Sequence, residues 1–226
     1  MSVSAVLLRL YRPVIVWGLV AVVAVEITVV TAILTFGPMS FSFWLVVLGS
    51  AAKYWPLVTG ILLISTYFRQ FVTNGVTRHE FLRALAVFSL GVVLVVPALV
   101  VLGHAAESLV LDLLGGRGGS YPAFRFGEAA AEFLHVLPAT AGYLASGILI
   151  SAGFYRFRVW IAVLFIVPGA VPALVTEILL KLDEYGEQSQ NLPLAIALTL
   201  SGAATVAAAI ATHRVMRDVA VKRTAV

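Results

Sequence analysis

The sequence predicts an all-α polytopic membrane protein with six membrane-spanning helices, and three observations lead to this fold class. Of its 226 residues, 61% are hydrophobic and only 12% are charged, whereas soluble domains carry roughly 25% charged residues. The apolar residues form continuous runs of about 20, the length that crosses the hydrocarbon core of a bilayer. These runs lack the alternation of apolar and polar residues that is typical of membrane β-barrels. Little chain remains outside them, so we expect one transmembrane domain over 1–226.

Six segments have the length and apolarity of a span. They are 13–36, 52–71, 82–103, 132–154, 158–180 and 193–212, followed by a cytoplasmic tail over 213–226. The first run has no small-residue cleavage site and is longer than the core of a signal peptide, so we expect an uncleaved helix. The chain contains no cysteine, which excludes disulfides, thiolate metal sites and cysteine nucleophiles.

Residues 2–12, before the first span, are amphipathic. One helical face carries apolar side chains and the other carries small or basic ones: Val3, Val6, Leu7, Leu10, Tyr11 and Val14 against Ser2, Ala5, Arg9 and Arg12. This pattern predicts a short interfacial helix on the inner leaflet. A basic flank of the first span explains the pattern equally well.

The segment 36–55 precedes the second span and combines helix breakers with aromatic residues. It contains Gly37-Pro38 and then Phe41, Phe43 and Trp44. Such a composition is typical of an interfacial segment on the outer side, and it also fits a second span that begins earlier than residue 52.

Lysine and arginine are distributed unevenly between the two sides of the predicted topology. Four lie on one side, namely Lys53, Arg117, Arg125 and Lys181, and eleven lie on the other, namely Arg9, Arg12, Arg69, Arg78, Arg83, Arg156, Arg158, Arg214, Arg217, Lys222 and Arg223. The side rich in basic residues is cytoplasmic by the positive-inside rule. We therefore expect a multi-pass protein of the bacterial cell (inner or plasma) membrane with both termini in the cytoplasm. These charges flank apolar runs, so the net charge of +4 indicates the lipid bilayer as partner and no nucleic acid.

The stretch FVTNGVTRHEF, 71–81, is a compact polar interruption between the second and third spans. Asn74-Gly75 supplies the left-handed residue that ends a helix. Thr77 is an N-cap residue, and Glu80 three positions later completes a capping box. The flanking apolar residues that form the matching hydrophobic staple are Val76 and Phe81. The stretch therefore predicts a tight helical corner.

The longer stretch TYFRQFVTNGVTRHEFLRA, 66–84, resembles the cytoplasmic loop between spans two and three of type-two ABC exporter permeases. These proteins are the membrane subunits of bacterial ATP-binding-cassette exporters, and many carry NGVTR-x-x-F or GVSR-x-x-F there. The six spans, cytoplasmic ends and N-terminal amphipathic segment agree with that family in outline. The outer segment KLDEYGEQSQNLP, between spans five and six, is shorter than in many members, which indicates a divergent branch.

The resemblance implies a permease subunit that is not itself an enzyme. It implies partners of two kinds: cytosolic ABC ATPase subunits, and a second copy of the permease or a sister permease. The chain has no G-x-x-x-x-G-K-[ST] phosphate loop, so ATP and magnesium would be held by the partner ATPase and this chain needs no cofactor. In such permeases the loop contacts the ATPase, a role that would here fall on Phe71, Asn74, Gly75, Arg78, Glu80 and Phe81.

Two acidic residues lie within predicted spans. Glu26 is near the middle of the first span, where a charge costs at least about 2.5 kcal/mol on insertion scales. It is a candidate for a polar pathway, and a helix–helix hydrogen bond explains it as well. Glu177 lies in the outer part of the fifth span, where a carboxylate reaches interfacial water.

Two Glu–His pairs suggest a different class of function. His104 and Glu107 end the third span, while Glu132 and His135 begin the fourth, each pair with i,i+3 spacing on one helix face. Two such pairs can build a metal site in a helical bundle. The first alternative to the permease is therefore an intramembrane metalloenzyme, and the second is a non-transporting accessory or immunity membrane protein.

Overall fold

The computed structural model describes residues 3–180 and 193–217, and the regular structure of this part is entirely helical. The elements are α1 (Val3–Leu34), α2 (Phe43–Leu62), the π-helix η1 (Leu63–Phe68), α3 (Arg69–Thr73), α4 (Arg78–Leu113), α5 (Ala129–Arg156), α6 (Val159–Leu164), α7 (Ile166–Leu180) and α8 (Leu194–Arg217). Within the described ranges, six helices are long and apolar enough to cross a membrane. The predicted all-α polytopic fold is confirmed.

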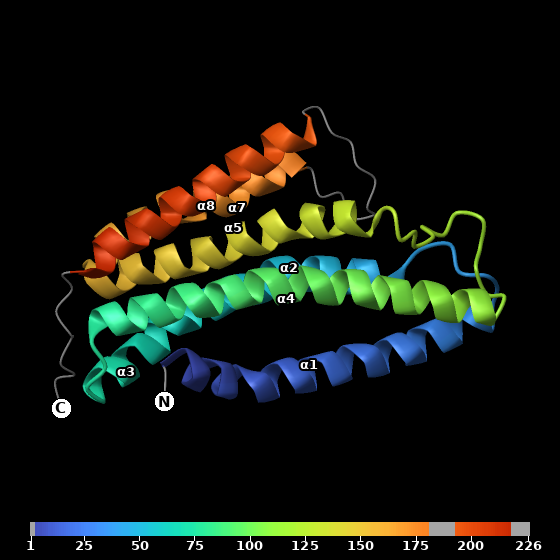
Figure 1. Ribbon diagram of the computed structural model, residues 1–226, viewed down its shortest axis with the longest axis horizontal. Helices are drawn as coiled ribbons and strands as arrows, with labels where there is room; N and C mark the ends of the chain where they lie inside the picture. Colours follow the sequence, from blue (N-terminus) through green and yellow to red (C-terminus); the bar gives the residue numbers. More distant parts are fainter. Residues whose placement is uncertain (1–2, 181–192, 218–226) are drawn as a thin grey trace.

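The spans run alternately up and down the long axis of the molecule (Figure 1). Helix α5 is central and packs against α2, α4, α7 and α8. Its small residues allow this, because glycine lets helix backbones approach closely. A Cβ atom on Gly147 would overlap the Leu57 carbonyl of α2, and one on Gly142 would lie 2.9 Å from the Pro172 carbonyl of α7. Helix α1 lies along the edge of the bundle beside α4 (Figure 1).

The N-terminal segment differs from the expectation of a separate interfacial helix over 2–12. Helix α1 continues without a break from Val3 to Leu34, with Pro13 inside it. The apolar face of the first turns packs on the protein, since Leu7 and Tyr11 are buried in a cluster with residues of η1, α4, α5 and α8. The first ten described residues are therefore the beginning of the first span, and the expected separate helix is corrected to a continuous one.

Several spans are longer than predicted. Helix α2 begins at Phe43, with Ser42 as its N-cap, so the segment 43–55 lengthens the second span. Helix α4 ends at Leu113 rather than 103, and α8 ends at Arg217 rather than 212. The rest of the predicted tail, 218–226, and the short segment KLDEYGEQSQNLP up to residue 192 lie outside the described residues.

Two spans are irregular. The second span contains η1, whose Leu63, Ile64 and Phe68 are fully buried, and the hydroxyl of Ser151 donates to the nearby Ile61 carbonyl at 3.0 Å. The fifth span is divided into α6 and α7 at Phe165. Pro168 explains this break, because proline has no N–H and its ring clashes with the carbonyl four residues earlier, that of Leu164.

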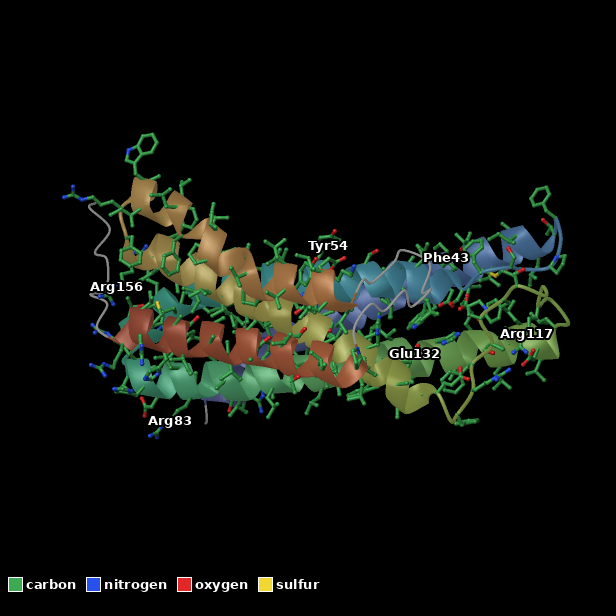
Figure 2. All side chains as sticks on the ribbon, turned by 90° about the horizontal axis from the view of Figure 1, so that it is seen from above. Phe43, Tyr54, Arg83, Arg117, Glu132 and Arg156 are labelled. Atoms are coloured by element: carbon green, nitrogen blue, oxygen red, sulfur yellow. The ribbon has the colours of Figure 1, made fainter. Side chains whose placement is uncertain are left out.

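The two ends of the bundle differ in charge. Arg83 and Arg156 lie at one end and Arg117 at the other (Figure 2). Because the helices alternate in direction, the described arginine residues of the side predicted to be rich in basic residues all lie at the first end. They are Arg9, Arg12, Arg69, Arg78, Arg83, Arg156, Arg158, Arg214 and Arg217. We call this end the arginine-rich end. At a rise of 1.5 Å per residue, the 36 residues of α4 span about 54 Å, so α4 extends well beyond a hydrocarbon core of about 30 Å.

Candidate functional site

The corner over 69–83, at the arginine-rich end, is closed by backbone hydrogen bonds on its first side. The N–H of Gly75 donates to the Val72 carbonyl at 3.2 Å, and the N–H of Val76 donates to the Phe71 carbonyl at 3.1 Å. Gly75 has a φ of 86°, in the left-handed region where a side chain is strained. These are the two bonds of a Schellman motif. The predicted helix stop at Asn74-Gly75 is confirmed.

A capping box closes the second side of the corner. The N–H of Glu80 donates to the Thr77 hydroxyl oxygen at 3.3 Å, and the N–H of Thr77 donates to the Glu80 carboxylate at 2.9 Å. The Thr77 hydroxyl also donates to that carboxylate, at 2.8 Å. The predicted capping box is confirmed, and it occupies the Glu80 carboxylate within the corner.

Aromatic side chains anchor the corner to the bundle. The Phe81 ring lies with its centroid 5.2 Å from that of Phe68 and 5.8 Å from that of Phe71. Phe81 is fully buried, and Val76 packs against the same cluster, as the predicted staple requires. The side chain of Phe81 thus lies in the core of this chain, and its expected contact with a partner stays a prediction. Phe71 is half-buried against this cluster.

The remaining residues of the corner face outward. Asn74 and Gly75 are exposed and Arg78 is half-buried. The side-chain amide of Asn74 donates to the Gln70 carbonyl at 2.7 Å. Within the described residues Arg78 makes no ion pair. The corner thus presents a short surface on which the guanidinium of Arg78 forms no ion pair within the described residues.

At the opposite end the four candidate metal ligands do not converge. His104 Nδ1 lies 3.0 Å from a Glu132 carboxylate oxygen, but Glu107 bonds to other residues and the Nδ1 atom of His135 is buried without a hydrogen-bond partner. Among the described residues, which include all four, no group of three or more such side chains is arranged to hold a metal ion. The four side chains therefore do not form one ligand group in the described structure, and the metalloenzyme alternative stays a prediction.

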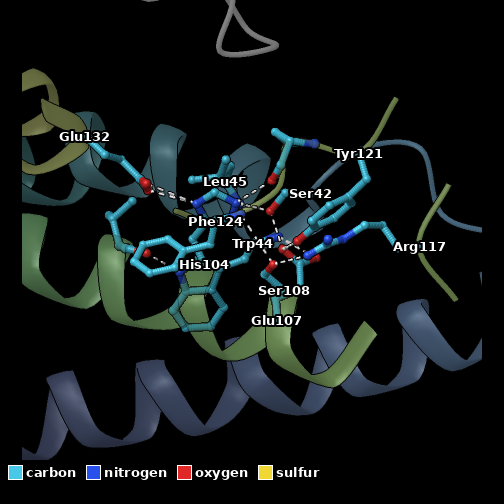
Figure 3. A network of polar contacts seen from close by, with 12 residues as sticks. Ser42, Trp44, Leu45, His104, Glu107, Ser108, Arg117, Tyr121, Phe124 and Glu132 are labelled. Carbon is cyan, nitrogen blue, oxygen red and sulfur yellow. Dashed lines mark hydrogen bonds and ion pairs between the residues drawn. The ribbon is translucent and has the colours of Figure 1, made fainter. Parts of the chain in front are cut away.

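Glu107 instead binds the N-terminus of α2 (Figure 3). One carboxylate oxygen accepts from the Phe43 N–H at 2.9 Å, and the other accepts from the hydroxyls of Ser42 and Tyr121. Glu107 is 5% exposed, and a buried carboxylate is stable when several donors surround it and a helix N-terminus faces it. Burial, and then the charge of Glu107, raise the pKa of the Tyr121 phenol, which keeps Tyr121 a neutral donor.

Further contacts tie the connection between α4 and α5 to this end. His104 bonds through Nε2 to the Pro122 carbonyl at 2.9 Å. The Arg117 guanidinium donates to the Ser108 hydroxyl at 2.8 Å and to the Asp112 carboxylate at 2.6 Å. Figure 3 shows these groups as one network, which we call the Glu107 network. Most of its polar groups are paired with one another, although the Nε atom of Arg117 is buried without a hydrogen-bond partner, and the network fixes the connection between α4 and α5.

Sequence reasoning missed Ser42 and Tyr121. Ser42 carries a local signal, because a serine before an apolar helical run is a typical N-cap, and its hydroxyl accepts from the Leu45 N–H at 3.1 Å. Tyr121 carries no comparable signal, because its partner Glu107 is reached only through the folding of the connection.

The acidic residues within spans have different surroundings. Glu177 of α7 forms an ion pair with Lys53 of α2 at 2.8 Å and accepts from the Tyr143 hydroxyl of α5 at 3.1 Å. Lys53 was expected only as a flanking charge, and it is instead part of a contact that joins three helices. Glu26 is half-buried on α1 and has no hydrogen-bond partner in the described part of the chain.

Comparison of the chain with protein-family models, with curated proteins and with solved structures gives no match. Its class therefore rests on its own architecture. It is a helical protein with six apolar helices of membrane-spanning length, a rigid corner at the arginine-rich end and a polar network at the opposite end.

Proposed function

We propose that the chain is the membrane-embedded permease subunit of an ABC exporter. The corner over 69–83 docks a separate cytosolic ATPase subunit, and ATP-driven closure of two such ATPases moves the helices through it. A second copy of the chain, or a sister permease, completes the transporter. The substrate path lies between the two permeases, lined by spans such as the first, second and fifth.

The observation that carries the proposal is the build of the corner. A turn between two spans needs only a helix stop and a helix start, which Gly75 and the Thr77–Glu80 box provide. Arg78 is not needed for either, because it is the first residue of α4, where the helix dipole disfavours a positive charge. A positive charge at that position is stabilised when it lies against an acidic surface of a partner protein. The sequence resemblance of 66–84 to the loop of exporter permeases supports the same partner.

The arginine-rich end provides the setting for such docking. By the positive-inside rule this end faces the cytoplasm, where ATPase subunits are found. Phe68, Phe71 and Phe81 pack together, so a force on the corner is transmitted to α2 and α4 rather than absorbed by a loose loop.

The test is Arg78→Glu in a complex with an ABC ATPase subunit that co-purifies with the unmodified chain. We expect normal expression and thermal stability, but loss of co-purification with the ATPase and loss of coupling between ATP hydrolysis and transport. Arg158→Glu is the matched control, because Arg158 is an exposed arginine of the same end outside the corner. Thr77→Ala should weaken the cap by about 1 kcal/mol with a smaller effect on co-purification.

Normal ATPase binding and transport by Arg78→Glu would remove the main support for the permease assignment. The corner would then be only a helix turn, and a non-transporting accessory or immunity membrane protein would describe the chain better.

A further inference from the structure

Four basic or ionisable residues lie near the place where the start of α4 meets the end of α8, and two of them are in ring contact. The rings of His79 and His213 have centroids 6.4 Å apart. Arg83 is one turn beyond His79 on the same face of α4, and Arg214 follows His213 on α8. All four side chains are exposed. We call this set the α4–α8 basic patch.

The position of the patch is fixed by the bundle. The guanidinium of Arg156, from α5, donates to the Val215 carbonyl at 2.6 Å and reaches the Arg214 carbonyl at 3.5 Å. A cation at the last carbonyls of a helix satisfies acceptors that the helix leaves unpaired. Met216 is fully buried, so the last turn of α8 is held by a cap and by packing. The basic side chains are thus presented from a rigid surface.

Within the described part of the chain, the charge of the patch is met in part by the Glu80 carboxylate, on which the nearby Arg83 charge acts. Neither Arg83 nor Arg214 forms an ion pair there. The carboxylate nearest in sequence is that of Glu80, which accepts two hydrogen bonds from Thr77. The patch is therefore a site for an external anion.

Apolar side chains continue directly from the patch along both helices. On α4, Val87, Leu90 and Leu94 follow His79 and Arg83 at helical spacing and are exposed. On α8, Val206 and Ile210 precede His213 and are exposed as well. A ligand at this place meets cationic groups at one end and apolar walls of a membrane-spanning bundle beside them.

We propose that the α4–α8 basic patch binds the headgroup of an anionic phospholipid of the inner leaflet, with the acyl chains along the apolar stripes of α4 and α8. The phosphate accepts from the guanidinium of Arg83 or Arg214 and from the imidazoles of His79 and His213. Basic side chains near a membrane surface contribute about 1 kcal/mol each to binding of anionic lipid. A soluble protein partner fits less well, because the exposed stripes beside the patch lie within the lipid-facing part of the helices.

Two residues of the patch, His79 and Arg83, also belong to the corner over 69–83 that docks the ATPase in the proposed function, whereas His213 and Arg214 of α8 lie outside that corner. The lipid assay therefore uses the full chain alone, without an ATPase, and its result does not depend on the proposed function.

The experiment measures thermal unfolding of the full chain in neutral detergent during titration with dioctanoyl phosphatidylglycerol. Dioctanoyl phosphatidylcholine, glycerol phosphate and inorganic phosphate are the comparison ligands. We expect phosphatidylglycerol alone to raise the midpoint of unfolding at low concentration. Arg83→Gln and Arg214→Gln should each weaken its apparent affinity about fivefold, and His79→Ala combined with His213→Ala should weaken it further.

Arg158→Gln is the matched control, because Arg158 is exposed at the same end but begins α6 rather than facing α4 or α8. It should retain the affinity of the unmodified chain. An equal loss with Arg158→Gln, or equal stabilisation by phosphatidylcholine, would overturn the proposal. Stabilisation by inorganic phosphate as strong as that by phosphatidylglycerol would also overturn it, since the site would then bind a free anion. If the double histidine variant does not fold, the two arginine variants decide the question.

Discussion

At the scale of the residue, Glu107 shows how a carboxylate that resembles a metal ligand becomes a structural acceptor. Its oxygens accept hydrogen bonds from Ser42, Tyr121 and the N-terminal amide of α2 at Phe43. Every donor comes from outside α4, so one side chain joins α2, α4 and the connection between α4 and α5. Burial of a carboxylate without hydrogen-bond partners costs free energy, whereas a buried carboxylate that accepts several hydrogen bonds stabilises the fold.

We predict that Glu107→Leu lowers the free energy of unfolding by about 3 kcal/mol or more, because it leaves several buried donors unpaired. Glu107→Gln keeps an acceptor oxygen and should cost about 1 kcal/mol. Thermal or denaturant unfolding in detergent measures both. The control is Asp112→Ala, which removes a half-exposed carboxylate of the same helix and should cost at most about 1 kcal/mol. Similar losses for Glu107→Leu and Asp112→Ala would contradict the role of Glu107 as the buried acceptor of the network.

At the scale of the element, α5 determines how the other spans pack. It contacts α2, α4, α7 and α8, and its glycines lie where the neighbouring backbones come closest. Gly60 of α2 contributes to the same contact, because a Cβ atom there would lie 2.6 Å from the Leu144 carbonyl. Apolar side chains gain little by leaving lipid for a helix interface, so close packing of small residues carries the association.

We predict that Gly147→Ala destabilises the protein by about 1–3 kcal/mol, the usual cost of overpacking, because the added methyl group would overlap the Leu57 carbonyl. The matched control is Gly91→Ala in α4, where no atom lies within 4 Å of the added carbon. That variant should be neutral or slightly stabilising, because alanine has the higher helix propensity. The measurement is the midpoint of thermal unfolding of each variant. Equal midpoints for Gly147→Ala and Gly91→Ala would show that the backbones of α2 and α5 are not in close contact at Gly147.

At the scale of the whole molecule, arginine is concentrated at one end of the long axis (Figure 2), and by the positive-inside rule this separation of charge favours one orientation of the bundle in a membrane. Exposed tryptophans support the same orientation of the bundle relative to the lipid. Trp17 is 73% exposed near Arg12, and Trp160 is 85% exposed near Arg158. Tryptophan prefers the boundary between headgroups and hydrocarbon, so we expect Trp17 and Trp160 to lie near that boundary at the arginine-rich end.

We predict that Asn74 faces the cytoplasm and Gly119 the outside. Single cysteines are informative because the chain has none of its own. Gly119 suits the purpose, since no atom lies within 4 Å of a Cβ atom built on it, whereas one on Gly118 would lie 2.8 Å from the Met39 carbonyl. In intact cells a membrane-impermeant thiol reagent should label Gly119→Cys and leave Asn74→Cys unlabelled until the cells are opened. The reverse pattern would invert the topology.

The features that depend on neighbouring residues could be predicted from the sequence by itself. Helix spans follow from the hydropathy of about 20 consecutive residues. The stop at Gly75 and the start at Thr77 follow from hydrogen bonds within a few residues. The separation of charge follows from the alternation of spans. The predicted boundaries of α2 and α4 differ from those in the structure, because hydropathy does not show how far a helix continues into water.

The partners of the polar side chains were decided only by the tertiary structure. His104, Glu107, Glu132 and His135 have the spacing of a metal site, but the rotation and relative height of α4 and α5 bring only His104 and Glu132 together. The pairing of Lys53 with Glu177 joins residues 124 positions apart. The spacing of residues within one helix determines which side chains share a face of that helix. The side chains opposite that face belong to neighbouring helices, and the packing of the helices determines which of them come into contact.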